Sequence, residues 1–140
     1  MLSIRDNELR AIRAQGETSY PHECCGFLLG GIDGARRRVD ALLSAENVHE
    51  ENHERRFLIT PKAYMFAERD ARARGQDIVG FYHSHPEHPA QPSQYDLDHA
   101  WPNLSYIIVS IQNGEAAELT SWVLADDREA FDAEGIERIA

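Results

Sequence analysis

The fold is decided by the stretch IVGFYHSHP at residues 78–86. Its first part is apolar on both faces, as expected of a central strand that is covered on both sides, and Pro86 ends the run. Because successive side chains of a strand alternate, His83 and His85 share one face at the strand end. Ser84 points to the opposite face, where a hydrogen-bonding or packing role is expected. The stretch therefore predicts a buried strand with two imidazoles on one side.

A short helix that begins at Ser93 is predicted to follow this strand. Seven residues, 86–92, separate His85 from Ser93, which is enough for a loop to fold back over the strand end. Asp96 then lies in the first turn of the helix. Two imidazoles and one carboxylate suit zinc, and a catalytic zinc keeps its fourth position for water. The alternative is that Ser93 and Asp96 only cap the helix and that the histidines are structural.

The rest of the chain predicts further helices and strands around this centre. Helices are expected at 4–15, ending near Gly16, and at 61–74, after the cap Thr60 and before Gly75. Strands are expected at 27–29, 39–43, 57–59, 106–111 and 119–124, with hairpin turns at Asp33-Gly34 and Asn113-Gly114. The last fifteen residues do not decide between helix and strand. The pattern predicts an α/β fold, a mixed β-sheet flanked by helices, in a single domain over residues 1–140.

The net charge of −10 argues against a nucleic-acid partner, since such binding depends on Lys and Arg neutralising phosphates. The one basic cluster, residues 36–38, is short, and a solvated strand edge is the favoured interpretation.

The adjacent Cys24 and Cys25 have Cα atoms about 3.8 Å apart, below the usual disulfide window. They are expected to be unpaired, buried, and hydrophobic rather than catalytic, as in a reducing compartment. No membrane-spanning run or secretory signal is visible, so the sequence favours a cytoplasmic protein with no membrane partner. It does not decide between a monomer and a homodimer.

The motif His-Ser-His-Pro, followed by Ser93-x-x-Asp96, resembles the signature of the JAMM metalloproteases, the catalytically active MPN domains. The segment YPHECCGFLLG at residues 20–30 is similar to the upstream glutamate strand of that family, with Glu23 in the place of the glutamate. The resemblance implies an MPN/JAMM-like, cytidine-deaminase-like architecture and one Zn²⁺ held by His83, His85 and Asp96. It also implies that Glu23 is the general base and that Ser93 stabilises the oxyanion.

The short loop at 86–92 resembles the compact prokaryotic members of the family. That resemblance implies a peptidase or isopeptidase that cleaves after the C-terminal Gly-Gly of a ubiquitin-like sulfur-carrier protein. Two alternatives stay open: a JAMM peptidase with another substrate, from a phage-tail or secondary-metabolite pathway, and a non-catalytic MPN scaffold. His88 lies in the same loop, where it either touches substrate or is a surface histidine.

Overall fold

The structure, a computed structural model, describes residues 1–45, 60–125 and 129–139. The described residues form, in chain order, β1 (Leu2–Arg5), α1 (Asp6–Ser19), β2 (Cys25–Asp33), β3 (Arg36–Ala45), α2 (Pro61–Ala73), β4 (Asp77–Pro86), α3 (Gln94–Asp98), β5 (Ser105–Gln112), β6 (Glu115–Leu124), β7 (Phe131–Glu134) and β8 (Ile136–Ile139). The predicted strand 57–59 lies outside these residues.

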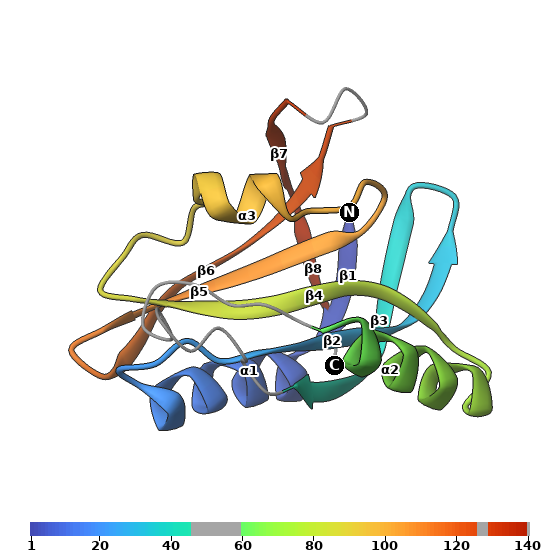
Figure 1. Cartoon of the computed structure of the whole chain (residues 1–140), viewed down its shortest axis with the longest axis horizontal. Helices are drawn as coiled ribbons and strands as arrows, with labels where there is room; N and C mark the ends of the chain where they lie inside the picture. Colours follow the sequence, from blue (N-terminus) through green and yellow to red (C-terminus); the bar gives the residue numbers. More distant parts are fainter. Residues whose placement is uncertain (46–59, 126–128, 140) are drawn as a thin grey trace.

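The strands form one mixed sheet with the order β7-β6-β5-β4-β2-β3-β1-β8 (Figure 1). The predicted central strand is β4, which pairs in parallel with β5 and antiparallel with β2. This confirms the predicted mixed sheet. It also explains the apolar sequence of β4, because a strand with neighbours on both edges and helices on both faces has little contact with water.

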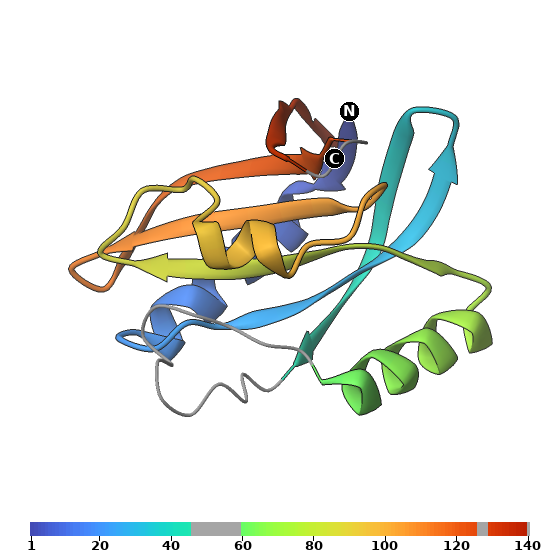
Figure 2. The same cartoon turned by 45° about the horizontal axis from the view of Figure 1, so that its top comes forward.

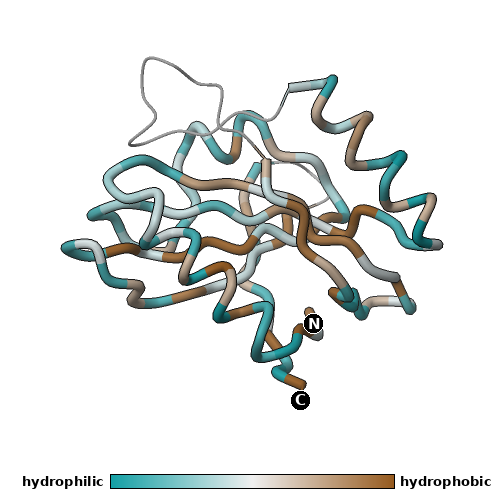
Figure 3. Tube along the Cα trace, turned by 90° about the horizontal axis from the view of Figure 1, so that it is seen from below, coloured by the Kyte–Doolittle hydropathy of each residue, from teal (hydrophilic) through white to brown (hydrophobic). Residues whose placement is uncertain are grey.

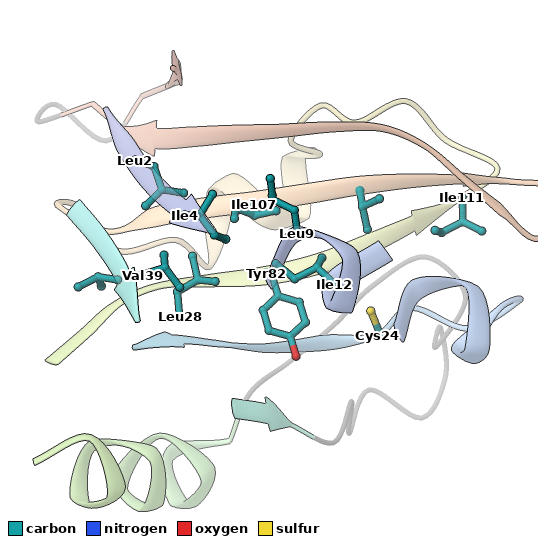
Figure 4. Packing of buried hydrophobic residues seen from close by; sticks show 12 residues of the cluster. Leu2, Ile4, Leu9, Ile12, Cys24, Leu28, Val39, Tyr82, Ile107 and Ile111 are labelled. Carbon is teal, nitrogen blue, oxygen red and sulfur yellow. The ribbon is translucent and has the colours of Figure 1, made fainter. Parts of the chain in front are cut away.

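Helices cover both faces of the sheet, and Figure 2 shows α3 in front of it and α1 behind it. Leu9 and Ile12 of α1 pack in one core with Tyr82 of β4 (Figure 4). On the opposite face, Ala67 and Ala71 of α2 belong to a second core with aromatic residues of β2, β4 and β5: Phe27, Phe81 and Tyr106. The hydrophobic residues accordingly gather along the central strands in Figure 3. The two cores hold β4, and with it the two histidines, between them.

The predicted caps and turns of the central elements are confirmed. The Thr60 hydroxyl accepts a hydrogen bond from the Ala63 amide at the start of α2, and Gly75, just past its end, has φ +70°. Asn113 and Gly114 form the hairpin turn between β5 and β6, and both have positive φ.

The predicted helix 4–15 is wrong at both ends. Residues 2–5 are strand β1, which pairs in parallel with β8 and β3, and α1 runs on to Ser19. Local periodicity could not reveal β1, because its partner β8 lies at the far end of the chain. Gly16 lies inside this helix. A Cβ at this position would lie 2.7 Å from the Ile111 side chain, so the glycine permits close packing of α1 on the sheet.

Residues 36–38 lie in a strand and are partly exposed, as predicted, but the interpretation of them as a sheet edge is wrong. These arginines belong to β3, which pairs with β2 on one side and with β1 on the other. Acidic partners neutralise them: Arg36 pairs with Glu137, Arg37 with Glu134, and Arg38 with Asp33 and Asp40.

Within the undecided C-terminal segment, the described residues 129–139 contain the two short strands β7 and β8. β7 extends one side of the sheet beside β6, and β8 extends the other beside β1. The bounds 1–140 for one domain stay a prediction. No helix among residues 1–45, 60–125 and 129–139 is long and apolar enough to span a membrane.

Candidate active site

The end of β4 presents His83 and His85 on one face of the sheet, as predicted. Their Nε2 atoms lie 3.0 Å apart, and both side chains are buried. Ser84 points to the other face, where its hydroxyl accepts a hydrogen bond from the Cys24 amide at 2.8 Å. The predicted hydrogen-bonding role of Ser84 is confirmed.

The loop at 86–92 returns the chain so that Asp96 meets the two imidazoles. Asp96 Oδ2 lies 3.3 Å from His83 Nε2 and 3.2 Å from His85 Nε2. The same oxygen accepts a hydrogen bond from the Ser93 amide, while the Ser93 hydroxyl accepts one from the Asp96 amide. The capping box and the three-residue cluster are therefore compatible, because the cap holds the carboxylate in place.

Glu23 reaches the same site from the segment just before β2. Cys25 pairs with His83 across the β2–β4 ladder, and Ser84 bonds Cys24, so the same register continued by two residues sets Glu23 opposite His85. Glu23 is 3% exposed. Its carboxylate and the two imidazoles offer ligand atoms within 4.8 Å of one another. All five predicted site residues thus meet at the end of β4.

Burial and mutual charge shape the ionisation of this cluster. Burial raises the pKa of Glu23 to about 9, and the nearby Asp96 charge adds to the rise. Burial lowers the pKa of His83 and so favours a neutral imidazole. Burial also acts to raise the pKa of Asp96, but its close contacts with the two histidines outweigh burial and lower this pKa. The cluster therefore favours an ionised Asp96 and a protonated Glu23.

The donor set fits a zinc ion. His85 Nδ1 lies 3.0 Å from the Pro89 carbonyl, which can only accept, so Nδ1 carries a proton and Nε2 is the ring nitrogen available to a metal. Ligands about 2.0–2.1 Å from a tetrahedral zinc lie roughly 3.3 Å from one another. The Nε2 and Oδ2 atoms of His83, His85 and Asp96 are separated by 3.0–3.3 Å. These separations match the spacing of zinc ligands. The ligand atoms of Glu23, His83 and His85 lie only within a wider limit of 4.8 Å, so Asp96 suits the third ligand position better than Glu23 does.

A pocket of about 310 Å³ opens beside the cluster. Its lining includes Glu23, His85, His88, Pro89, Pro92 and Ser93. His88 is exposed and borders this pocket, so its position is compatible with contact to a bound chain. Sequence reasoning missed the Pro89 carbonyl as a partner of His85, because a backbone group leaves no trace in residue type.

The two cysteines are free and buried, as predicted. Burial raises the pKa of Cys25 to about 12 and also raises that of Cys24. A thiolate is the reactive form of cysteine, so neither residue is prepared to act as a nucleophile.

The chain belongs to the family described as prokaryotic homologs of the JAB domain, whose model matches residues 6–125. The predicted family is thereby confirmed.

Three relatives are similar to this chain in sequence. A desampylase from Haloferax volcanii is 36% identical over 107 residues, which cover 76% of this chain and 75% of the relative. Tail tip assembly protein K of Escherichia phage N15 is 31% identical over 93 residues, covering 66% of this chain and 34% of the relative. A Thermus thermophilus protein named "Probable TtuB-protein conjugate cleaving protease" is 32% identical over 78 residues, covering 56% of this chain and 52% of the relative.

Solved structures share the fold. A protein from Salinibacter ruber is 42% identical with a TM-score of 0.77, covering 98% of this chain and 91% of that one. A JAB1/MPN domain protein from Archaeoglobus fulgidus is 18% identical with a TM-score of 0.63, covering 99% and 97%. The second likeness concerns the fold alone, and it confirms the predicted single-domain MPN/JAB α/β architecture.

Proposed function

We propose that this chain is a zinc-dependent peptidase that cleaves after the C-terminal Gly-Gly of a ubiquitin-like sulfur-carrier protein. The chain is a hydrolase of peptide or isopeptide bonds, the class to which its relatives named desampylase and conjugate cleaving protease belong. The observation that carries the zinc site is the position of Asp96 Oδ2, within 3.3 Å of both imidazole Nε2 atoms. His83, His85 and Asp96 would hold the ion, which when bound activates water and polarises a carbonyl.

Glu23 would serve as the general base from the wall of the pocket. It would take a proton from the attacking water and deliver it to the leaving amine. In the metal-free site its pKa is raised to about 9, mainly by burial. Beside a dication Glu23 is expected to ionise, because a neighbouring positive charge favours the carboxylate.

Ser93 would stabilise the oxyanion. Its Oγ accepts the Asp96 amide hydrogen, so the hydroxyl proton is left to donate, and Ser93 lines the pocket. A hydroxyl placed there can donate to the oxygen of the scissile carbonyl as negative charge develops.

The substrate part of the proposal rests on the relatives and on the steric demands of the site. The relatives are named for the removal of protein conjugates. A Gly-Gly tail has no side chain to obstruct its approach between the loop at 86–92 and Glu23. The two free cysteines support a reducing compartment, and we place the enzyme in the cytoplasm on that basis.

A sulfur carrier extended beyond its Gly-Gly end tests both parts of the proposal. Mass spectrometry should detect loss of the extension in the presence of zinc and none after complete chelation. A matched carrier with Val in place of the last Gly should be cut far more slowly. Undiminished cleavage after zinc removal would contradict the mechanism, whereas failure to cut any extended carrier would contradict only the substrate.

Two other functions make different predictions. The likeness to tail tip assembly protein K favours a peptidase of a phage-tail precursor, although the chain spans only about a third of that protein. Cleavage of such a precursor in preference to the carrier would support it. A non-catalytic scaffold is disfavoured because all five site residues are assembled, and a scaffold would not require stoichiometric zinc.

A further inference from the structure

Three consecutive carbonyls of the loop between β4 and α3 are each held by a side chain of the sheet. The His88 carbonyl accepts a hydrogen bond from the Ser110 hydroxyl at 2.6 Å. The Pro89 carbonyl accepts one from His85 Nδ1 at 3.0 Å, and the Ala90 carbonyl accepts one from the Thr120 hydroxyl at 2.6 Å. Exposed loops commonly leave such carbonyls to water, so this arrangement fixes the backbone on both sides of the group that orients His85.

The two hydroxyls have defined directions. Gln112 Nε2 donates to Ser110 Oγ at 2.7 Å, and Trp122 Nε1 donates to Thr120 Oγ1 at 2.8 Å. Because an indole N–H only donates and a carbonyl only accepts, the Thr120 hydroxyl proton has to point at the loop. The Ser110 hydroxyl lies between an amide donor and a carbonyl in the same way. Each hydroxyl thus passes a hydrogen bond from the sheet to the loop, and such chains strengthen their members.

The sheet register places these hydroxyls on the face of the histidines. Ser110 of β5 is the partner of His85, and Ile108 is the shared partner of His83 and Thr120. Paired residues of neighbouring strands lie on the same face of a sheet. Ser110 and Thr120 therefore lie on the same face as His85 and His83. The β5–β6 pairing shifts register between Val109 and Ile111, at Ser110 itself. Such irregularities are typical of positions that redirect a side chain beside an active site.

We propose that Ser110 and Thr120 are positioning residues of the metal centre. They hold the His88 and Ala90 carbonyls, which fixes the Pro89 carbonyl between them. The Pro89 carbonyl then keeps a proton on His85 Nδ1 and turns Nε2 toward His83 and Asp96. The effect on zinc affinity rests on the proposed function, whereas the effect on the His85 tautomer does not. Both residues act through the loop and touch neither substrate nor metal.

Two substitutions at Thr120 separate the hydroxyl from its packing. Thr120→Val keeps the shape and removes the hydroxyl, and Thr120→Ser keeps the hydroxyl and removes a methyl group. Competition with a chromophoric chelator should give a zinc Kd about tenfold weaker for Thr120→Val, as is common for residues behind a metal ligand, and nearly unchanged for Thr120→Ser. The opposite ranking would overturn the proposal, because it would assign the effect to packing.

The His85 tautomer gives a second readout that needs no zinc. Nitrogen-15 NMR of the metal-free protein should show His85 protonated at Nδ1 in the wild type and a mixture of tautomers in Ser110→Ala and Thr120→Val. Ser3→Ala is the matched control, because Ser3 is a buried strand serine whose hydroxyl bonds Glu137. An unchanged tautomer in both variants would overturn the proposal. If the wild-type protein bound no zinc, the proposed zinc site would be contradicted. The His85 tautomer would still test whether Ser110 and Thr120 position His85.

Discussion

Two buried carboxylates of this sheet have opposite surroundings. Glu134 of β7 accepts hydrogen bonds from the hydroxyls of Ser105 and Ser121 at 2.7 and 2.9 Å. It also pairs with Arg37 at 3.1 Å and with the amino group of Met1 at 3.3 Å. Donors and cations thus surround this carboxylate, which ties Met1 and β3 to β5, β6 and β7.

Glu23 is also buried but shares its site with another carboxylate and two imidazoles. Its pKa is raised to about 9 where a surface glutamate would titrate near its ordinary value. The two carboxylates therefore have different roles. Glu134 stabilises the fold through its donors and cations, whereas the Glu23 site brings together electron-pair donors that suit a bound cation. Substitutions at the two positions should therefore affect different properties.

The largest expected effect is on turnover. Glu23→Gln should lower kcat by roughly 10²–10⁴-fold, because the amide cannot accept the proton that general-base catalysis transfers. Zinc content should remain near one ion per chain, since the nearer oxygen belongs to Asp96. Steady-state cleavage and metal analysis of the same preparation measure both quantities. Loss of zinc in this variant would make Glu23 a ligand and refute the assigned roles.

The next effect is on the pH dependence of stability in the metal-free protein. The raised pKa keeps Glu23 protonated in the folded state up to about 9, while in the unfolded chain it ionises near 4.5. Between these values the folded state binds the extra proton, so the free energy of unfolding falls as pH rises. Relative to Glu23→Gln, the wild type should lose about 1.4 kcal/mol per pH unit in this window.

Urea unfolding with chelator present, repeated from pH 5 to 9, provides the comparison. Subtracting the Glu23→Gln curve removes the contributions of all other titrating groups. Two parallel curves would show that the Glu23 environment does not favour the neutral acid.

Glu134→Gln should affect stability and leave the chemistry intact. Removing one member of a buried ion pair costs about 3 kcal/mol, because Arg37 keeps a charge that is only 14% exposed. Urea unfolding should detect this loss, while zinc Kd and kcat stay at wild-type values. A fall in zinc affinity as large as that in stability would contradict the division between the two sites.

Ser93→Ala combines both kinds of effect at smaller size. The lost hydroxyl should lower kcat by about 10²-fold if it stabilises the oxyanion. It should also cost about 1 kcal/mol of stability through the lost helix cap. An unchanged kcat at reduced stability would leave Ser93 with the capping role alone.

The sequence predicted the centre of the molecule better than its edges. Strand β4 carries its own signals, an apolar run, alternating histidines and a final proline, and the hairpin at Asn113-Gly114 carries a turn signal. β1 was missed and residues 36–38 misjudged, because both depend on pairing between distant segments of the chain. Glycine often ends a helix, so the sequence predicts a helix end at Gly16. Its close contact with Ile111 is a tertiary contact, which local sequence does not show.

The candidate site divides in the same way. His83, His85 and Asp96 follow from strand alternation and loop length. Glu23 could be selected from the other acidic residues only through family resemblance, since the β2–β4 register that sets it opposite His85 is not visible in the sequence. Ser110 and Thr120 could not be found, because neither residue type nor spacing marks a hydroxyl that holds a loop carbonyl.

The most direct test of the central claim is an anomalous difference map at the zinc edge from crystals of the wild-type protein. We predict one peak about 2.0–2.2 Å from His83 Nε2, His85 Nε2 and an Asp96 carboxylate oxygen, with Glu23 beyond bonding distance. A peak bonded to Glu23 in place of Asp96, or no peak at the end of β4, would contradict the account.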